Sequence, residues 1–124
     1  MNLNQVTLPA TDIPESVAFY KQLGLRQIVD SPHYSRFECP DGDTTFSLHI
    51  TGEFTPNQHY VTYFEIENLD EFVAEKVAAG IHFDQMPRDM RWQWREARLR
   101  DPAGNVICLF WAGDMRKNPP WRVD

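Results

Sequence analysis

The sequence contains two copies of one pattern, and this internal repeat constrains the fold more than any other feature. Residues 5–25, QVTLPATDIPESVAFYKQLGL, align without a gap with residues 61–81, VTYFEIENLDEFVAEKVAAGI. Each copy then reaches a turn rich in Pro, Asp and Gly, at residues 40–42 and 101–104, and an apolar run follows each turn. A duplicated unit of this kind predicts a pseudo-twofold molecule. We expect a ligand to bind where the two halves meet.

The first copy has the pattern of a strand, a helix and three further strands. We expect a strand over residues 3–8 and a helix over residues 13–23, with Asp12 as N-cap and Glu15 as its capping partner. The alternation of polar and apolar residues then predicts strands over residues 25–30, 34–39 and 44–50.

The second copy repeats this order. Asn68 is the expected N-cap of its helix, Glu71 the capping partner, and the helix should end before Gly80. The expected strands are residues 59–66, 81–84, 92–100 and 105–111, and the tail from residue 113 has the pattern of neither helix nor strand. The predicted fold class is α+β, with two βαβββ modules forming a curved mixed sheet that has a groove on one side and the helices on its outer face.

We expect residues 1–124 to form a single domain. Its first module covers about residues 3–50, its second about residues 59–111, and the tail is residues 112–124. A chain of 124 residues is long enough to bury about two-thirds of its unfolded surface without disulfides or metals.

Composition and charge exclude several classes of partner. The formal net charge of −6 is opposite to the basic surface that nucleic-acid binding needs. No stretch approaches the ~18 consecutive apolar residues of a membrane span, and the first residues lack the pattern of a signal peptide. Cys39 and Cys108 have no metal-binding spacing. We therefore expect a cytoplasmic protein with reduced cysteines that binds neither nucleic acid nor membrane.

Two segments resemble the vicinal oxygen chelate superfamily, which includes glyoxalase I, fosfomycin-resistance enzymes, extradiol dioxygenases and bleomycin-binding proteins. They are the opening VTLPATDIPESVAFYKQLGL and the closing RDPAGNVICLFW, and with the second copy they cover most of residues 3–111. The turn Asp101-Pro102-x-Gly104 before an apolar strand is the more specific of the two signals. The resemblance implies the fold, and a homodimer, since members commonly dimerise and a small domain leaves sheet edges unpaired. It does not imply one reaction, because one scaffold carries many chemistries.

The resemblance also implies where a metal would bind. Metal-dependent members place ligands at positions that match Gln5, Ser47, Val61 and Cys108 here. Valine cannot ligate, a neutral serine hydroxyl is a weak donor, and Cys108 would have to lose its proton. We therefore expect no metal at this position and no other cofactor. A displaced metal site remains an alternative, with these candidate ligands: His49, His59, Glu65 and Glu96.

Strand periodicity selects the side chains that should line the groove, because alternate residues of a strand face the same side. These candidate ligand-binding residues are Gln5, Thr7, Arg36, Ser47, His49, Val61, Tyr63, Trp94, Glu96, Arg98, Cys108 and Phe110. In a regular strand over residues 92–100, Trp92 and Trp94 share a face with Glu96 and Arg98, which predicts an aromatic wall with charged groups.

Three hypotheses for the function follow. The first is a metal-independent protein that binds an aromatic or cationic small organic ligand. The second is a lyase, isomerase or dioxygenase-like enzyme, with a displaced metal or with acid–base chemistry by His49 and Glu96. The third is a module whose groove receives another chain or its own tail, with Trp121 as the plug. The poor metal quartet favours the first hypothesis over the second, and the polar groove residues favour it over the third. The sequence assigns no catalytic residue.

Overall fold

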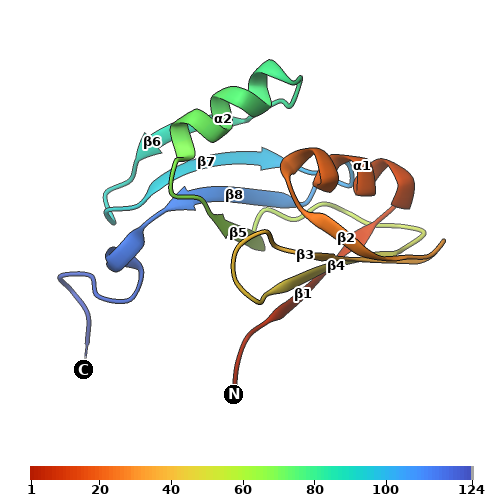
Figure 1. Cartoon of the computed structure of the whole chain (residues 1–124), viewed down its shortest axis with the longest axis horizontal. Helices are drawn as coiled ribbons and strands as arrows, with labels where there is room; N and C mark the ends of the chain where they lie inside the picture. Colours follow the sequence, from red (N-terminus) through yellow and green to blue (C-terminus); the bar gives the residue numbers. More distant parts are fainter. Residues whose placement is uncertain (124) are drawn as a thin grey trace. The chain divides into compact units, whose positions relative to one another are not determined.

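The computed structural model of the chain describes residues 1–123, and its elements follow the duplicated pattern (Figure 1). The first module contains β1 (Gln5–Ala10), α1 (Ile13–Leu23), β2 (Arg26–Asp30), β3 (Tyr34–Glu38) and β4 (Thr45–Ile50). The second contains β5 (Val61–Glu65), α2 (Leu69–Ala78), β6 (Gln85–Asp89), β7 (Arg95–Arg100) and β8 (Val106–Trp111), after which the 3₁₀ helix η1 (Gly113–Arg116) follows. The predicted α+β class and the βαβββ modules are confirmed.

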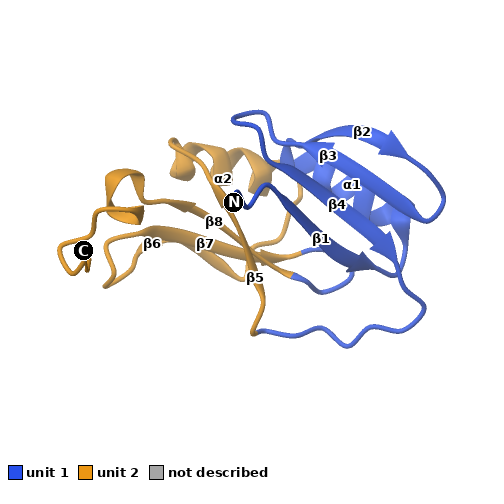
Figure 2. Cartoon of the chain, turned by 90° about the horizontal axis from the view of Figure 1, so that it is seen from below, with its two compact units in different colours: residues 1–58, 101–105 blue, residues 59–100, 106–124 orange. Residues whose placement is uncertain are grey.

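Each module builds its own mixed sheet. In the first module the strand order is β1-β4-β3-β2, where β1 runs parallel to β4 and the other pairs are antiparallel. The second module has the equivalent order β5-β8-β7-β6, with β5 parallel to β8. Figure 2 colours the chain by its two compact units, which follow the modules except at one loop: unit 1 is residues 1–58 with 101–105, and unit 2 is residues 59–100 with those from 106 onward.

The first helix forms where its capping signals predict. The Asp12 side chain accepts a hydrogen bond from the Glu15 N–H at 3.0 Å, and Gly24 ends the helix with a φ of 122°, which a residue with a Cβ rarely adopts. Tyr20 on α1 is fully buried, and its ring packs against Phe46 with the ring centroids 4.6 Å apart. This contact fixes which face of the unit 1 sheet the helix covers.

The loop between β7 and β8 belongs to unit 1. The Tyr20 hydroxyl donates to Asp101 Oδ2 at 2.6 Å, and the side-chain amide of Asn105 donates to the Pro9 carbonyl at 3.0 Å. The other Asp101 oxygen accepts from the backbone N–H groups of Ala103 and Asn105, which closes the turn. Burial and the negative charge of Asp101 raise the pKa of Tyr20 well above its usual range.

The second helix copies the first less completely. Leu69 and Val73 on α2 are buried, as the repeat predicts, and the helix ends at Ala78. Asn68 is the N-cap residue, as predicted, but its side chain does not make the expected capping hydrogen bond. The backbone explains the difference: Asn68 has φ −97° and ψ 56°, whereas Asp12 has the extended conformation that aims a side chain at the first turn.

The predicted strand bounds fail for the second and third strands of unit 2, counted from β5. The second strand, β6, spans Gln85–Asp89 and not residues 81–84, and the third, β7, starts at Arg95 rather than at residue 92. A tight turn precedes β7: Met90 N–H donates to the Trp94 carbonyl at 2.7 Å, and Gln93 has a φ of 67°. Left-handed backbone at Gln93 interrupts the alternation that a regular strand over residues 92–100 requires.

The tail also differs from its prediction. It contains η1, and the N–H groups of its N-cap residue Ala112 and its first residue Gly113 donate to the Glu65 carboxylate at 3.0 and 2.9 Å. Trp121 is 55% exposed, so the expected role of this residue as a plug is not supported. Among residues 1–123, no helix is both long enough and apolar enough to span a membrane.

Candidate functional site

One face of the unit 1 sheet, opposite the face that packs on α1, carries a row of polar residues. The strand register aligns Thr7 on β1 with Ser47 on β4, and Ser47 with Arg36 on β3. Gln5 and His49 occupy the same face on the neighbouring rows, beside Thr45 and Tyr34 respectively. Every predicted unit 1 site residue therefore lies on one side of one sheet.

These side chains form a hydrogen-bonded network centred on Ser47, which is fully buried. The Gln5 side-chain amide donates to Ser47 Oγ, and Gln5 Oε1 accepts from the Thr45 hydroxyl. Ser47 Oγ also lies 2.6 Å from the Tyr34 hydroxyl, to which Arg36 Nε donates at 2.9 Å. The Ser47 hydroxyl thus has its hydrogen-bond partners, Gln5 and Tyr34, on its own sheet.

Tyr34 is a residue of this site that the sequence analysis did not select. Although desolvation raises its pKa, the hydrogen bonds with Ser47 and Arg36 and the positive charge of Arg36 outweigh that effect, so the pKa is lowered. The signal was available, because Tyr34 is two residues from Arg36 on the same strand and so faces the same side. His49 is exposed, and its ring stands edge-on to that of Tyr34, with the centroids 6.5 Å apart.

Unit 2 presents an aromatic corner, formed by Tyr63, Trp94 and Phe110, at the equivalent place. The Trp94 indole stacks on Phe110 with the centroids 4.7 Å apart and 22° between the planes. The Tyr63 ring stands at 89° to both, 5.9 Å from Trp94 and 5.5 Å from Phe110. Val61 and Trp94 pack against a buried cluster that contains Cys108 and Phe110.

A buried carboxylate lies beside the aromatic corner. Glu96 is only 1% exposed, and its Oε2 accepts from the Trp92 indole N–H at 2.7 Å. Its Oε1 accepts from Arg98 Nη2 at 3.2 Å. The prediction that Trp92 belongs to a regular strand face is therefore wrong. Trp92 instead reaches the site from the turn before β7, by donating a hydrogen bond to Glu96.

Cys108 is buried in the same cluster, with its sulfur 3.6 Å from Glu96 Oε1. Burial, together with the negative charge of Glu96, raises the pKa of the Cys108 thiol to about 12. The thiol is therefore protonated at neutral pH, and a protonated thiol is neither a good nucleophile nor a good metal ligand.

The residues at the superfamily's metal positions do not fit a metal ion. Val61 has no donor atom, Cys108 keeps its proton, and Ser47 already bonds to Gln5 and Tyr34. Within residues 1–123, no group of three or more His, Cys, Asp or Glu side chains is arranged to hold a metal. Two carboxylates of the alternative set are engaged elsewhere, Glu65 by the backbone of η1 and Glu96 by Trp92 and Arg98.

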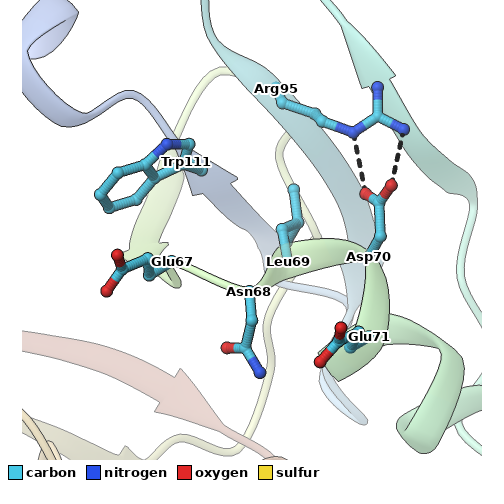
Figure 3. A pocket seen from close by; sticks show the side chains of 7 residues that line it. All are labelled: Glu67, Asn68, Leu69, Asp70, Glu71, Arg95 and Trp111. Carbon is cyan, nitrogen blue, oxygen red and sulfur yellow. Dashed lines mark hydrogen bonds and ion pairs between the residues drawn. The ribbon is translucent and has the colours of Figure 1, made fainter.

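A pocket of about 280 Å³ opens on unit 2 near the start of α2 (Figure 3). Its lining residues are Glu67, Asn68, Leu69, Asp70, Glu71, Arg95 and Trp111. Arg95 donates two hydrogen bonds to the Asp70 carboxylate, from Nε at 2.8 Å and from Nη2 at 3.1 Å. This hydrogen bonding lowers the pKa of Asp70. None of the predicted site residues lines this pocket, so it is separate from the aromatic corner.

The predicted site residues thus fall into two sets, each held together within its own unit. The unit 1 set is Gln5, Thr7, Arg36, Ser47 and His49, and the unit 2 set is Val61, Tyr63, Trp94, Glu96, Arg98, Cys108 and Phe110. That the two sets line one shared groove stays a prediction.

Comparisons with known proteins identify the family. The sequence profile of the Glyoxalase/Bleomycin resistance protein/Dioxygenase superfamily matches residues 2–109. The structure resembles a bleomycin resistance determinant encoded on transposon Tn5, with a TM-score of 0.75 and 20% identity over 90% of this chain and 98% of that chain. A bleomycin-binding protein complexed with bleomycin gives a TM-score of 0.72 at 20% identity, again over 90% and 98%. A family enzyme from Burkholderia phytofirmans PsJN gives 0.74 at 22% identity, over 90% and 99%.

No curated protein matches the sequence significantly. At the identities of the solved structures, their likeness establishes the fold alone.

Paired βαβββ modules with mixed sheets define an α+β protein of the vicinal oxygen chelate fold. The chain belongs to the Glyoxalase/Bleomycin resistance protein/Dioxygenase superfamily, since the profile of that family covers most of its length. This membership supports small-molecule binding at the level of the family.

Proposed function

We propose that this protein binds a small organic molecule that carries a flat ring, at the aromatic corner of unit 2. The observation that carries the proposal is the geometry of three rings: Trp94 stacks on Phe110, and Tyr63 stands perpendicular to both. Tyr63 is 44% exposed and Trp94 is partly exposed, so both offer ring surface to a ligand. A planar ligand would stack on one ring and meet the other edge-on, the two arrangements that aromatic pairs prefer.

Family membership supports this proposal. Two of the solved structures with this fold are described as a bleomycin-binding protein and a bleomycin resistance determinant. The scaffold therefore serves ligand binding in proteins that resemble this chain in fold.

The proposed binding needs no metal. Its support is the donor set at the superfamily's metal positions, which offers a valine, a hydrogen-bonded serine and a protonated thiol. We expect a chelator to leave ligand affinity unchanged, and protein purified without chelators to contain less than stoichiometric metal. Stoichiometric metal that is lost in Gln5→Ala or His49→Ala would contradict metal independence.

A second candidate function, acid–base catalysis, is favoured by Tyr34. Its phenol oxygen faces two potential hydrogen-bond donors, Arg36 and Ser47, which stabilise the phenolate relative to an exposed tyrosine. A phenol of lowered pKa is a suitable proton-transfer group. For any reaction found, Tyr34→Phe should abolish turnover while ligand affinity is kept; unchanged turnover would remove this candidate.

The binding proposal is tested by a thermal-shift screen of aromatic small molecules, with cationic compounds included because the net charge of −6 made them an expectation of the sequence. Compounds that stabilise the protein should lose this effect in Trp94→Ala. Trp111→Ala is the matched control, since Trp111 is also a partly exposed indole of unit 2 but lies at the separate pocket. Hits that survive Trp94→Ala unchanged would refute the aromatic corner as the site.

We also propose that the protein is a homodimer, as the resemblance implied. Sedimentation equilibrium gives the mass directly, and a monomer across the micromolar range would contradict this.

A further inference from the structure

We infer that the ligand of unit 2 is an aromatic acid: a flat ring that bears a carboxylate, with the carboxylate bound by Arg98. This inference rests on the proposed ring binding and adds the charge of the ligand. It departs from the cationic ligand that the overall charge of −6 suggests.

Arg98 stands beside the aromatic corner. Arg98 on β7 and Tyr63 on β5 are both register partners of Cys108 on β8, so they flank it on the same sheet row. Arg98 Nη2 lies 3.5 Å from the Tyr63 hydroxyl oxygen, and the Arg98 side chain is 30% exposed. A molecule stacked at this corner therefore lies next to a guanidinium group.

The Arg98 guanidinium has N–H groups beyond those that its contacts with Glu96 and Tyr63 use. Both of its contacts within residues 1–123, to Glu96 and to Tyr63, use Nη2. Nε and Nη1 therefore have hydrogens without an acceptor in this part of the chain, and guanidinium groups bind carboxylates through such paired N–H groups. Because the Tyr63 oxygen accepts from Arg98, its own proton is available as a further donor to the ligand.

Glu96 fixes the position of Arg98 and does not compete for a cationic ligand. The carboxylate is 1% exposed, and each of its oxygens already accepts a hydrogen bond, from Trp92 or from Arg98. At this degree of burial the carboxylate offers a ligand almost no surface. We therefore assign Glu96 as a positioning residue, which holds the Arg98 side chain through Nη2 and leaves Nε and Nη1 for a ligand.

The other carboxylate of this face is also occupied. Glu65 accepts from the N–H groups of Ala112 and Gly113, and Arg116 lies 3.7 Å from its Oε1. The corner thus offers a ligand spare guanidinium donors, whereas Glu96 and Glu65 are each paired with an arginine of the chain, which favours an anion. The repulsion from the net charge of −6 is weak at this range, because salt screens exposed charges beyond about 8 Å under physiological conditions.

Three ring-matched probes test the inference: naphthoate, naphthamide and naphthylmethylammonium, each titrated by ligand-observed NMR. We expect naphthoate to bind about tenfold more tightly than naphthamide, as a charge-assisted hydrogen bond does over a neutral one. The ammonium compound should bind most weakly. This ranking is measured on the unaltered protein, so it does not depend on whether a variant folds.

Variants then locate the charge preference. Arg98→Gln alone would leave Glu96 buried without its cation, so the double variant E96Q/R98Q is used, and we expect it to bind naphthoate and naphthamide equally. Arg36→Gln is the matched control, because Arg36 holds the same register position in unit 1, opposite Ser47. This control should keep the full preference.

The outcomes separate the two proposals. If none of the probes binds, the ring-binding function and the acid preference both fall. If all three bind equally, or if the ammonium compound binds best, the ring-binding function stands and the acid preference is overturned. A preference that survives E96Q/R98Q but disappears in Arg36→Gln would overturn the assignment to Arg98.

Discussion

The two modules agree on the side of each sheet that packs on a helix and differ on the opposite side. On the packed side, Leu48 of unit 1 corresponds by strand register to Leu109 of unit 2, and both are fully buried. On the opposite side, His49 corresponds to Phe110, and Tyr34 corresponds to Glu96. A duplicated core tolerates little change because it is close-packed, whereas an open face can acquire new chemistry without repacking.

The open faces have become different in kind. Unit 1 carries a polar network around Ser47, and unit 2 carries stacked rings above a buried carboxylate. The central arginine is common to both, as Arg36 and Arg98. This contrast supports the proposals that a ring binds at unit 2 and that proton transfer belongs to unit 1.

The sharpest test of this contrast is to remove the polar group at the equivalent position of each unit. Glu96→Ala deprives Trp92 and Arg98 of their buried acceptor, so we expect the free energy of unfolding to fall by about 3 kcal/mol. Tyr34→Phe should cost less than about 1 kcal/mol, because Arg36 is exposed to water and buried Ser47 keeps its hydrogen bond with Gln5. Urea denaturation measures both values, and equal losses would break the comparison.

The next test concerns the tether of α1, that is, the hydrogen bond from Tyr20 on α1 to Asp101, which α2 lacks. Tyr20→Phe removes the hydrogen bond to buried Asp101 and should lower the free energy of unfolding by about 2 kcal/mol. The residue of α2 that corresponds to Tyr20 in the repeat is Lys76. Lys76→Ala should change the free energy of unfolding by less than about 0.5 kcal/mol.

Tyr20 also gives this tether a pH dependence. Its pKa is raised in the folded state, so its stabilisation is complete below the pKa of an unfolded tyrosine, about 10, and is lost as pH rises above it. The loss of stability between neutral and strongly alkaline pH should therefore be smaller in Tyr20→Phe than in the unaltered protein.

A smaller difference separates the two helix caps. Asp12→Ala should lower the free energy of unfolding by about 1 kcal/mol, because it removes the bond to the Glu15 N–H. Asn68→Ala should have an effect below about 0.5 kcal/mol, since Asn68 makes no side-chain capping bond. Thermal unfolding of the two variants side by side decides this, and a larger effect at Asn68 would show that its side chain does cap α2.

The smallest effect is one of reactivity alone. Cys108, with its pKa raised to about 12, should not react with a disulfide-exchange reagent at pH about 8 until the protein unfolds. Cys39 is partly exposed and should react first, at a rate slowed by its own raised pKa. Mass spectrometry of the labelled peptides identifies which thiol reacted, and early labelling of Cys108 would contradict its burial.

The sequence predicted the modules because their signals are local. A cap at Asp12, a glycine at the helix end and alternation along β4 and β8 each act within a few residues, and each placed its element correctly. The start of β7 could not be predicted in this way. The left-handed backbone at Gln93 is a property of a turn that the residue types of the segment do not announce.

The candidate site residues were selected by strand face, whereas their bonding partners were not predictable. Periodicity placed Glu96 and Cys108 on one side, but the pairing of Glu96 with the Trp92 indole depends on the turn before β7. Periodicity also places Tyr34 on the face of Arg36, but nothing in its own segment indicates the Ser47 hydroxyl, which bonds to it from the neighbouring strand.

The loop at residues 101–105 has a consequence for dissecting the protein. Its residues belong to the second half of the sequence, but the loop is part of unit 1, where Asp101 accepts a hydrogen bond from the Tyr20 hydroxyl. A fragment ending at residue 58 would lack that loop and would leave a buried phenol without its acceptor, a loss of about 1 to 3 kcal/mol. Split-gene expression should therefore yield a soluble first fragment only when the second is made alongside it.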